Sequence, residues 1–263
     1  MRYIHLYFTC MKRAIISKLE YKKDAIISII SFFISNICSI LSIYFILNSI
    51  PKLEGWSMAE IGFLYGFSML PVAVDHCFSD DLWLVAFYKV KEGKMDHMFL
   101  RPVPVLFQVL SETFQIEALG ELIVGVIMIT ICGSIVQVEW SFGLFVMLCI
   151  ATIFGALIIT ALKIIVASLA FIFKRSGPLL SIIYGFITYT RYPLKIYPKM
   201  IQVVLMFVFP FALIIYFPIE VLIFNSYSPY LISLLIILVS IIFFTLSIII
   251  WNLNIRKYES SGS

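Results

Sequence analysis

The sequence predicts an all-α, polytopic helical membrane protein with six transmembrane helices. Of its 263 residues, 62% are hydrophobic and only 13% are charged, and several apolar runs reach the roughly 20 residues that a helix needs to cross a bilayer. A soluble domain of this length could not bury so much apolar surface in one core. Helices satisfy their own backbone hydrogen bonds in lipid, and the short alternating segments typical of a membrane β-barrel are missing.

The first 24 residues predict an amphipathic helix that lies on the cytoplasmic membrane surface. Six of them are Lys or Arg. Apolar residues recur among them at three- and four-residue steps: Ile4, Tyr7, Phe8, Met11, Ile15 and Leu19. A basic helix with one apolar face is typical of an interfacial segment. A disordered basic tail is the alternative.

Residues 25–251 are predicted to form the transmembrane domain, and residues 252–263 a cytoplasmic tail. The expected spans cover about residues 25–50, 59–78, 117–136, 141–173, one short crossing that begins near residue 178, and 230–251. In the second span, Gly62 and Gly66 have the GxxxG spacing that permits close contact with another helix.

Positive charge orients these spans. Most Lys and Arg residues lie in the N-terminal segment, in the loop at about residues 79–110, at residues 174–175 and at residues 256–257. The positive-inside rule places all four segments in the cytoplasm. Both termini are then inside, and the number of crossings is even.

Residues 190–199, with the sequence TRYPLKIYPK, interrupt the apolar region 176–225. This region of 50 residues is too long for one span. A second full crossing, however, would place the basic tail outside the cell and an uncharged turn in the cytoplasm, against the positive-inside rule. We therefore expect an outer re-entrant hairpin at about residues 191–224, because its prolines stop the helix. An outer gate of a translocation path is predicted at Arg191, Tyr192, Pro193, Lys195, Tyr197 and Pro198. An anchor at the outer interface is the alternative.

Ionisable residues inside predicted spans are candidate functional residues. Glu121 and Lys163 both lie in the inner halves of their spans, and we expect them to form an intramembrane ion pair. Asp75 and His76 lie near the inner end of the second span, where a solvated position is expected. No HExxH motif or nucleophile elbow occurs, so neither catalytic residues nor a metal site are predicted.

The loop between the second and third spans carries the most specific motif. Residues 91–96 read KEGKMD and residues 100–104 read LRPVP. Together with the proline-bearing stretch and the polar tail, in this order, they resemble a permease of the type 2 ABC transporter (ABC-2-type) family. The resemblance covers essentially the whole chain.

The resemblance implies the membrane-spanning permease subunit of an exporter for a hydrophobic or amphipathic substrate. Its partners would be a dimer of separate cytoplasmic ATP-binding subunits, a second permease chain (the same or a related one) and the lipid membrane, without nucleic acid. ATP and Mg²⁺ would bind to the ATPase and no cofactor to this chain, which has no GxxxxGK[ST] loop. The expected location is a bacterial cell membrane, with both termini cytoplasmic.

The resemblance also implies that this loop holds a coupling helix that contacts the ATPase. The residues expected to take part are Glu92, Gly93, Met95, Asp96, Phe99, Leu100, Arg101 and Pro102. The apolar side of the helix, which includes Met98, would pack in a groove of the partner; a solvated connecting loop is the alternative. Two other functions stay open, an ATP-independent carrier or channel and an intramembrane enzyme. Co-purification of an ATPase would separate them from an ABC permease.

Overall fold

The computed structural model describes residues 2–20, 26–27, 30–31, 33–38, 41, 45 and 53–260. The predicted first span, residues 25–50, therefore lies largely outside the described residues. The α-helices are α1 (Arg2–Glu20), α3 (Met58–Ser79), α4 (Asp81–Leu84), α5 (Asp96–Phe99), α6 (Val105–Glu112), α7 (Ala118–Val136), α8 (Phe142–Phe173), α9 (Gly177–Tyr189), α10 (Lys199–Val203), α11 (Phe217–Phe224) and α12 (Pro229–Ile255). The shorter π or 3₁₀ turns are η1 (Val85–Lys89), η2 (Leu194–Ile196), η3 (Val204–Val208) and η4 (Ala212–Tyr216).

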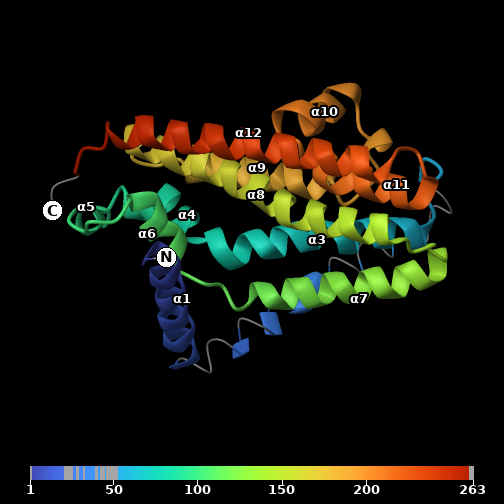
Figure 1. Ribbon diagram of the computed structural model, residues 1–263, viewed down its shortest axis with the longest axis horizontal. Coiled ribbons are helices and arrows are strands. Elements are labelled where there is room, and N and C mark those ends of the chain that lie inside the picture. Colours follow the sequence, from blue (N-terminus) through green and yellow to red (C-terminus); the bar gives the residue numbers. More distant parts are fainter. Residues whose placement is uncertain are drawn as a thin grey trace.

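Four long apolar helices, α3, α7, α8 and α12, run along the length of the molecule (Figure 1). Within the described part of the chain these four helices are long and apolar enough to cross a membrane, and a bent pair makes up to five. The prediction of a helical, multi-span membrane protein is confirmed. The count of six stays a prediction, because one of the six expected spans lies outside the described residues.

Helix α3 lies between α7 and α8 and packs against both, while α12 packs along α8 (Figure 1). The contact between α3 and α7 is close because glycines line it. A Cβ added at Gly66 would lie 2.7 Å from Met128 Cβ, and one added at Gly125 would lie 2.9 Å from the Gly66 carbonyl oxygen. The GxxxG motif of the second span therefore lies at a helix–helix contact, which its spacing permits.

The region after α9 is broken, as its prolines predicted. Pro193 and Pro198 directly precede η2 and α10, where the missing proline N–H breaks no helical hydrogen bond. The helical stretches Lys199–Val208 and Ala212–Phe224 then meet at a bend of 84°. The bend marks a broken span or a re-entrant loop; the expected re-entrant path stays a prediction.

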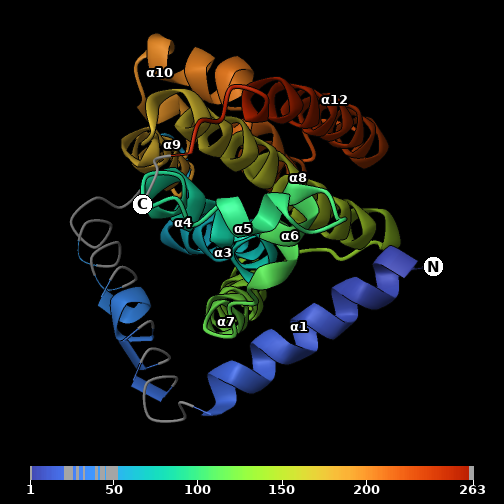
Figure 2. The ribbon, with the colours of Figure 1, turned by 90° about the vertical axis from the view of Figure 1, so that its left-hand side faces the viewer.

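The short helices α4, α5 and α6 and the last described residues gather at one end of the bundle, together with α1 (Figure 1). We call this the α1 end. Helix α1 lies crosswise to the long helices, as the view toward this end shows (Figure 2). It packs on α6, where the rings of Tyr7 and Phe107 meet edge to face at 6.2 Å. This crosswise position is the one that an interfacial helix would take.

Candidate functional site

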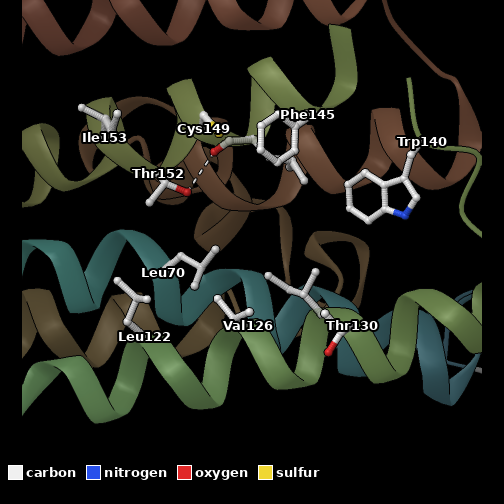
Figure 3. Close-up of a pocket in the computed structure, with 11 residues that line it drawn as sticks. Leu70, Leu122, Val126, Thr130, Trp140, Phe145, Cys149, Thr152 and Ile153 are labelled. Carbon is white, nitrogen blue, oxygen red and sulfur yellow. Dashed lines mark hydrogen bonds between the residues drawn. The ribbon is translucent and has the colours of Figure 1, made fainter. Parts of the chain in front are cut away.

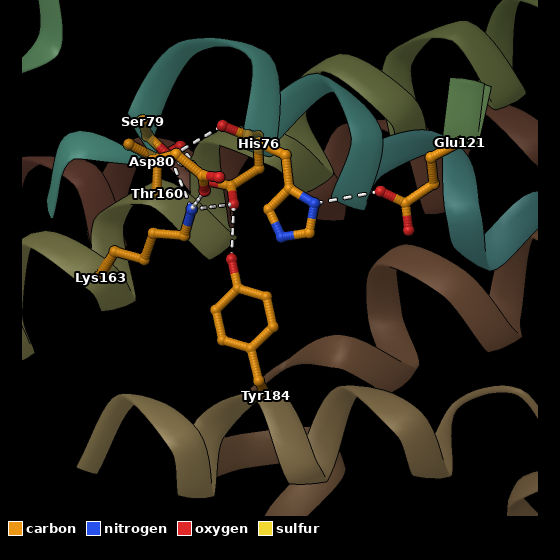
Figure 4. A network of polar contacts seen from close by, with 8 residues as sticks. His76, Ser79, Asp80, Glu121, Thr160, Lys163 and Tyr184 are labelled. Carbon is orange, nitrogen blue, oxygen red and sulfur yellow. Dashed lines mark hydrogen bonds and ion pairs between the residues drawn. The ribbon is translucent and has the colours of Figure 1, made fainter. Parts of the chain in front are cut away.

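A network of buried polar side chains ties α3, α8 and α9 together near the α1 end (Figure 4). Its centre is Lys163 of α8, whose side chain is fully buried. The ammonium Nζ lies 2.7 Å from Asp75 Oδ2 and 2.9 Å from Asp80 Oδ1, and it donates a hydrogen bond of 3.1 Å to Ser79 Oγ. We call these residues, with Thr160 and Tyr184, the Lys163 network.

The carboxylate of Asp75 is saturated with donors. Its Oδ1 accepts hydrogen bonds from Ser79 Oγ at 2.6 Å and Thr160 Oγ1 at 2.7 Å. Its Oδ2 accepts one from Tyr184 Oη at 2.9 Å in addition to the ion pair with Lys163. An ionised carboxyl group has about four lone-pair sites, so these four donors fill them. Such complete pairing is what allows opposite charges to be buried.

A second pair joins α7 to the same region. His76 Nδ1 lies 3.0 Å from Glu121 Oε2, and the His76 ring stacks on that of Tyr184 with the centroids 5.5 Å apart (Figure 4). Helices α3, α7, α8 and α9 are thus connected by polar contacts at one level of the bundle. The arrangement fixes the helices relative to one another through ion pairs and hydrogen bonds within the protein.

Two predictions about these charges were wrong. Lys163 does not pair with Glu121, because α3 lies between α7 and α8 and supplies the partners of both residues. Asp75 is not solvated but is only 1% exposed. The sequence did contain a signal for the correct pairing. A lone lysine deep in an apolar helix requires a carboxylate, and Asp75 was already a candidate.

A cluster that sequence analysis missed lies next to the network, outside the long helices. Lys89 Nζ lies 2.7 Å from Asp81 Oδ2 and 2.6 Å from Glu112 Oε2, and thereby ties α4 and η1 to α6. Burial raises the pKa of Asp81, and the neighbouring Lys89 opposes this rise. The two carboxylates hold the pKa of Lys89 above its usual range although burial favours the neutral amine. This cluster anchors the base of the loop predicted to contact a partner.

In that loop, the structure divides the predicted coupling residues into two groups. Met95 and Met98 are fully buried in the chain's own core, and the Gln108 side chain donates hydrogen bonds to the carbonyls of Met98 at 2.9 Å and Val103 at 2.8 Å. Phe99 and Leu100 point outward and are 42% and 86% exposed. The expectation that the two methionines face a partner was therefore wrong. Both side chains pack into the chain's own core and hold the loop in place.

The remaining predicted coupling residues form the polar surroundings of this helix. Glu92, Asp96, Arg101 and Pro102 are exposed, and Glu92 pairs with Lys94 at 2.7 Å. Gly93 has a φ of 68°, which a glycine adopts without strain. The loop turns at this residue before α5 begins. The coupling role of all these residues stays a prediction.

The predicted outer-gate residues lie in the broken region between α9 and α10. The Arg191 guanidinium lies 5.1 Å from the ring centroid of the buried Tyr65, and Tyr197 lies 5.3 Å from Tyr189 by ring centroids. Tyr192 is partly buried and Pro193 is buried, while Lys195 and Pro198 are exposed. The structure therefore brings Arg191 against α3 and leaves Lys195 at the surface. Their action as a gate stays a prediction.

An apolar cavity of about 560 Å³ lies between α3, α7 and α8 (Figure 3). Leu70, Val126 and Phe145 point into it from the three helices, and Trp140 lies at one end (Figure 3). The Thr152 hydroxyl donates to the Leu148 carbonyl at 2.9 Å, so this polar group is satisfied within its own helix. A hydrocarbon group is the chemistry that such a lining fits.

The fold and these sites define a multi-span helical membrane protein with a structured loop region at one end. Among the described residues, no group of three His, Cys, Asp or Glu side chains could hold a metal ion. The family described as ABC-2 family transporter protein matches residues 33–262. The chain belongs to this family, as its motifs predicted, and is a transporter membrane subunit. No curated protein and no solved structure matches the chain.

Proposed function

We propose that this chain is the permease subunit of an ATP-driven exporter and is coupled to a separate ATPase through the loop that contains α5. The observation that supports this proposal most directly is the outward position of Leu100, 86% exposed, on a loop that is anchored from behind. Contiguous exposed apolar side chains are typical of protein contacts, and the neighbouring Phe99 is also 42% exposed. The groove of an ATPase would bury Leu100 and Phe99 together.

The division of labour follows from what the chain contains. It has no phosphate-binding GxxxxGK[ST] loop, so ATP and Mg²⁺ would bind to the ATPase. The permease would provide the membrane path, completed by a second permease chain. A hydrophobic or amphipathic substrate is supported by the apolar lining of the cavity between α3, α7 and α8.

We further propose six crossings with both termini in the cytoplasm. The crosswise position of α1 at the same end as the C-terminal tail supports this orientation (Figure 2). Single cysteines should be introduced at Gln137, Ser228 and Lys257, all exposed, in a chain without its native cysteines. We expect an impermeant thiol reagent to label the first two from outside, and Lys257→Cys only after the membrane is opened. Labelling of Ser228→Cys from the cytoplasmic side alone would refute this topology.

Leu100→Glu is expected to weaken attachment of the ATPase at least about tenfold. Full burial of a leucine side chain contributes about 1.5–3 kcal/mol, and each 1.4 kcal/mol changes a binding constant about tenfold. The measurement is the affinity of the purified permease in nanodiscs for the ATPase that co-purifies with it. Met200→Glu is the matched control, because Met200 is also apolar and 80% exposed but lies on α10. Equal affinity of Leu100→Glu and wild type would exclude this contact.

A further inference from the structure

The last described residues of the chain contact α5 directly. The carboxylate of Asp96 accepts hydrogen bonds from Tyr258 Oη and from Ser260 Oγ, each at 2.6 Å. The Tyr258 ring also stacks on Phe99, with centroids 5.1 Å apart and planes 15° apart. We call these contacts the tail clasp. Because Asp96 and Phe99 are the first and last residues of α5, the tail contacts both ends of this helix.

The tail itself is held by the end of α8. The rings of Tyr258 and Phe171 meet edge to face, with their centroids 5.8 Å apart, and Lys174 Nζ donates a hydrogen bond of 2.7 Å to the Glu259 carbonyl. Hydrogen bonds from Ser260 and Tyr258 hold the pKa of Asp96 below its usual range, so its carboxylate stays charged at neutral pH. The clasp thus connects α5 to a long helix of the bundle.

Helix α5 depends on such contacts. It has four residues and no side-chain cap at its N-terminus, and isolated helices shorter than about 12 residues are marginal in water. Met95, Met98 and the Gln108 side chain hold its inner face. The tail clasp contacts its outer face, and removing it would take away the ring that stacks on Phe99.

Exposed charged residues surround α5 on both the loop and the tail. Within residues 91–101 and 256–260, the exposed cations are Lys91, Lys94, Arg101, Arg256 and Lys257, and the exposed anions are Glu92, Asp96 and Glu259. Five cations against three anions leave the combined surface positive. The apolar side chains at its centre are Phe99 and Leu100. A complementary partner would therefore present an apolar pocket with an acidic rim.

We propose that α5 and the C-terminal tail form one composite docking surface for the partner ATPase, in which Tyr258 and Ser260 act as positioning residues for Phe99 and Leu100. The docking part of this inference rests on the proposed function, whereas the clasp does not. The partner is a protein subunit with an apolar pocket and an acidic rim.

The test combines Tyr258→Phe with Ser260→Ala, which removes both hydroxyl groups and keeps the aromatic ring. Glu259→Gln is the control, because this residue contributes its backbone carbonyl to the contact with Lys174. Hydrogen exchange of the full-length permease in nanodiscs should become about two- to tenfold faster for the amides of residues 96–101 in the double variant. It should stay unchanged in the control. Unchanged exchange in the double variant would refute the clasp.

The second readout is the affinity of the same variants for the co-purifying ATPase, together with substrate exported per ATP hydrolysed. We expect the double variant to lower both the affinity for the ATPase and the amount of substrate exported per ATP. Adding Arg101→Asn to the double variant, with Asp96 intact, should restore neither quantity. Faster exchange without any change in affinity or coupling would refute the composite surface. If wild-type permease binds no ATPase while the exchange of the double variant rises, the clasp stands and the proposed function fails.

Discussion

Replacing Lys163 with methionine is expected to destabilise the helix bundle by about 3–5 kcal/mol, because it removes the cation from a buried cluster of charges. Asp75, whose side chain is fully buried, would lose its ion pair at 2.7 Å, and Asp80 would lose one at 2.9 Å. Two negative charges would remain close together without the lysine, and only Asp75 would keep the hydrogen bonds from Ser79, Thr160 and Tyr184. We expect a large fall in the unfolding temperature of the detergent-solubilised protein and a low yield.

Two further variants make this result specific. Lys195→Met removes an exposed lysine and should leave the unfolding temperature almost unchanged. Asp75→Asn in the Lys163→Met background removes one of the two unpaired charges and should recover part of the lost stability. If Lys163→Met were as stable as wild type, or if the double variant were no more stable than the single one, the Lys163 network would not hold the helices together.

Gly125→Ala is expected to weaken the contact between α3 and α7 by about 1–3 kcal/mol, the usual effect of overpacking. The added methyl group would lie 2.9 Å from the Gly66 carbonyl oxygen and 2.9 Å from Leu70 Cδ2. Leu70 can change its rotamer, but the backbone carbonyl cannot move without shifting the helix. The measurement is again thermal unfolding in mild detergent.

Gly185→Ala is the matched control for this substitution. Gly185 also lies within a helix, α9, but a Cβ at this position meets nothing within 4 Å. Because alanine favours a helix over glycine by about 0.5–1 kcal/mol, this variant should be as stable as wild type or slightly more stable. Equal stability of both variants would show that α3 and α7 can separate without loss.

The positions of the long helices could be predicted from the sequence because the bilayer imposes a strong length and hydropathy signal. The second predicted span, residues 59–78, corresponds to α3 at Met58–Ser79, and the last, 230–251, to α12 at Pro229–Ile255. The prolines of residues 190–199 predicted the interruption after α9. These features depend on local composition, which a single sequence contains.

The partners of the buried charges could not be predicted in the same way. Hydropathy gives the depth of Glu121 and Lys163 in the membrane but not which helix lies between them. The two residues belong to α7 and α8, which are consecutive in sequence but separated by α3. The sequence of a short loop helix also does not indicate which of its faces is buried. For this reason Met95 and Met98 were predicted to face a partner, although they lie on the buried side.

The contact between the tail and α5 is a long-range feature that local patterns do not encode. Tyr258 and Asp96 are 162 positions apart. Because both segments are polar, composition alone predicts that water surrounds them, and the tail was predicted only as a polar cytoplasmic segment. Only the fold shows that the ends of α8 and α12 bring the tail to the loop. The sequence therefore predicts one part of the candidate docking surface, the loop with the KEGKMD and LRPVP motifs, but not the contact of this loop with the tail.

The most direct test of the central proposal is substrate export from proteoliposomes that contain the permease with or without its co-purifying ATPase. A fluorescent long-chain amphiphile placed in the membrane can serve as the probe. We expect movement between leaflets only when both the ATPase and Mg²⁺-ATP are present, and at least about a tenfold lower rate with Leu100→Glu. Equal movement with the permease alone, without ATP, would contradict an ATP-driven permease and indicate an ATP-independent carrier or channel.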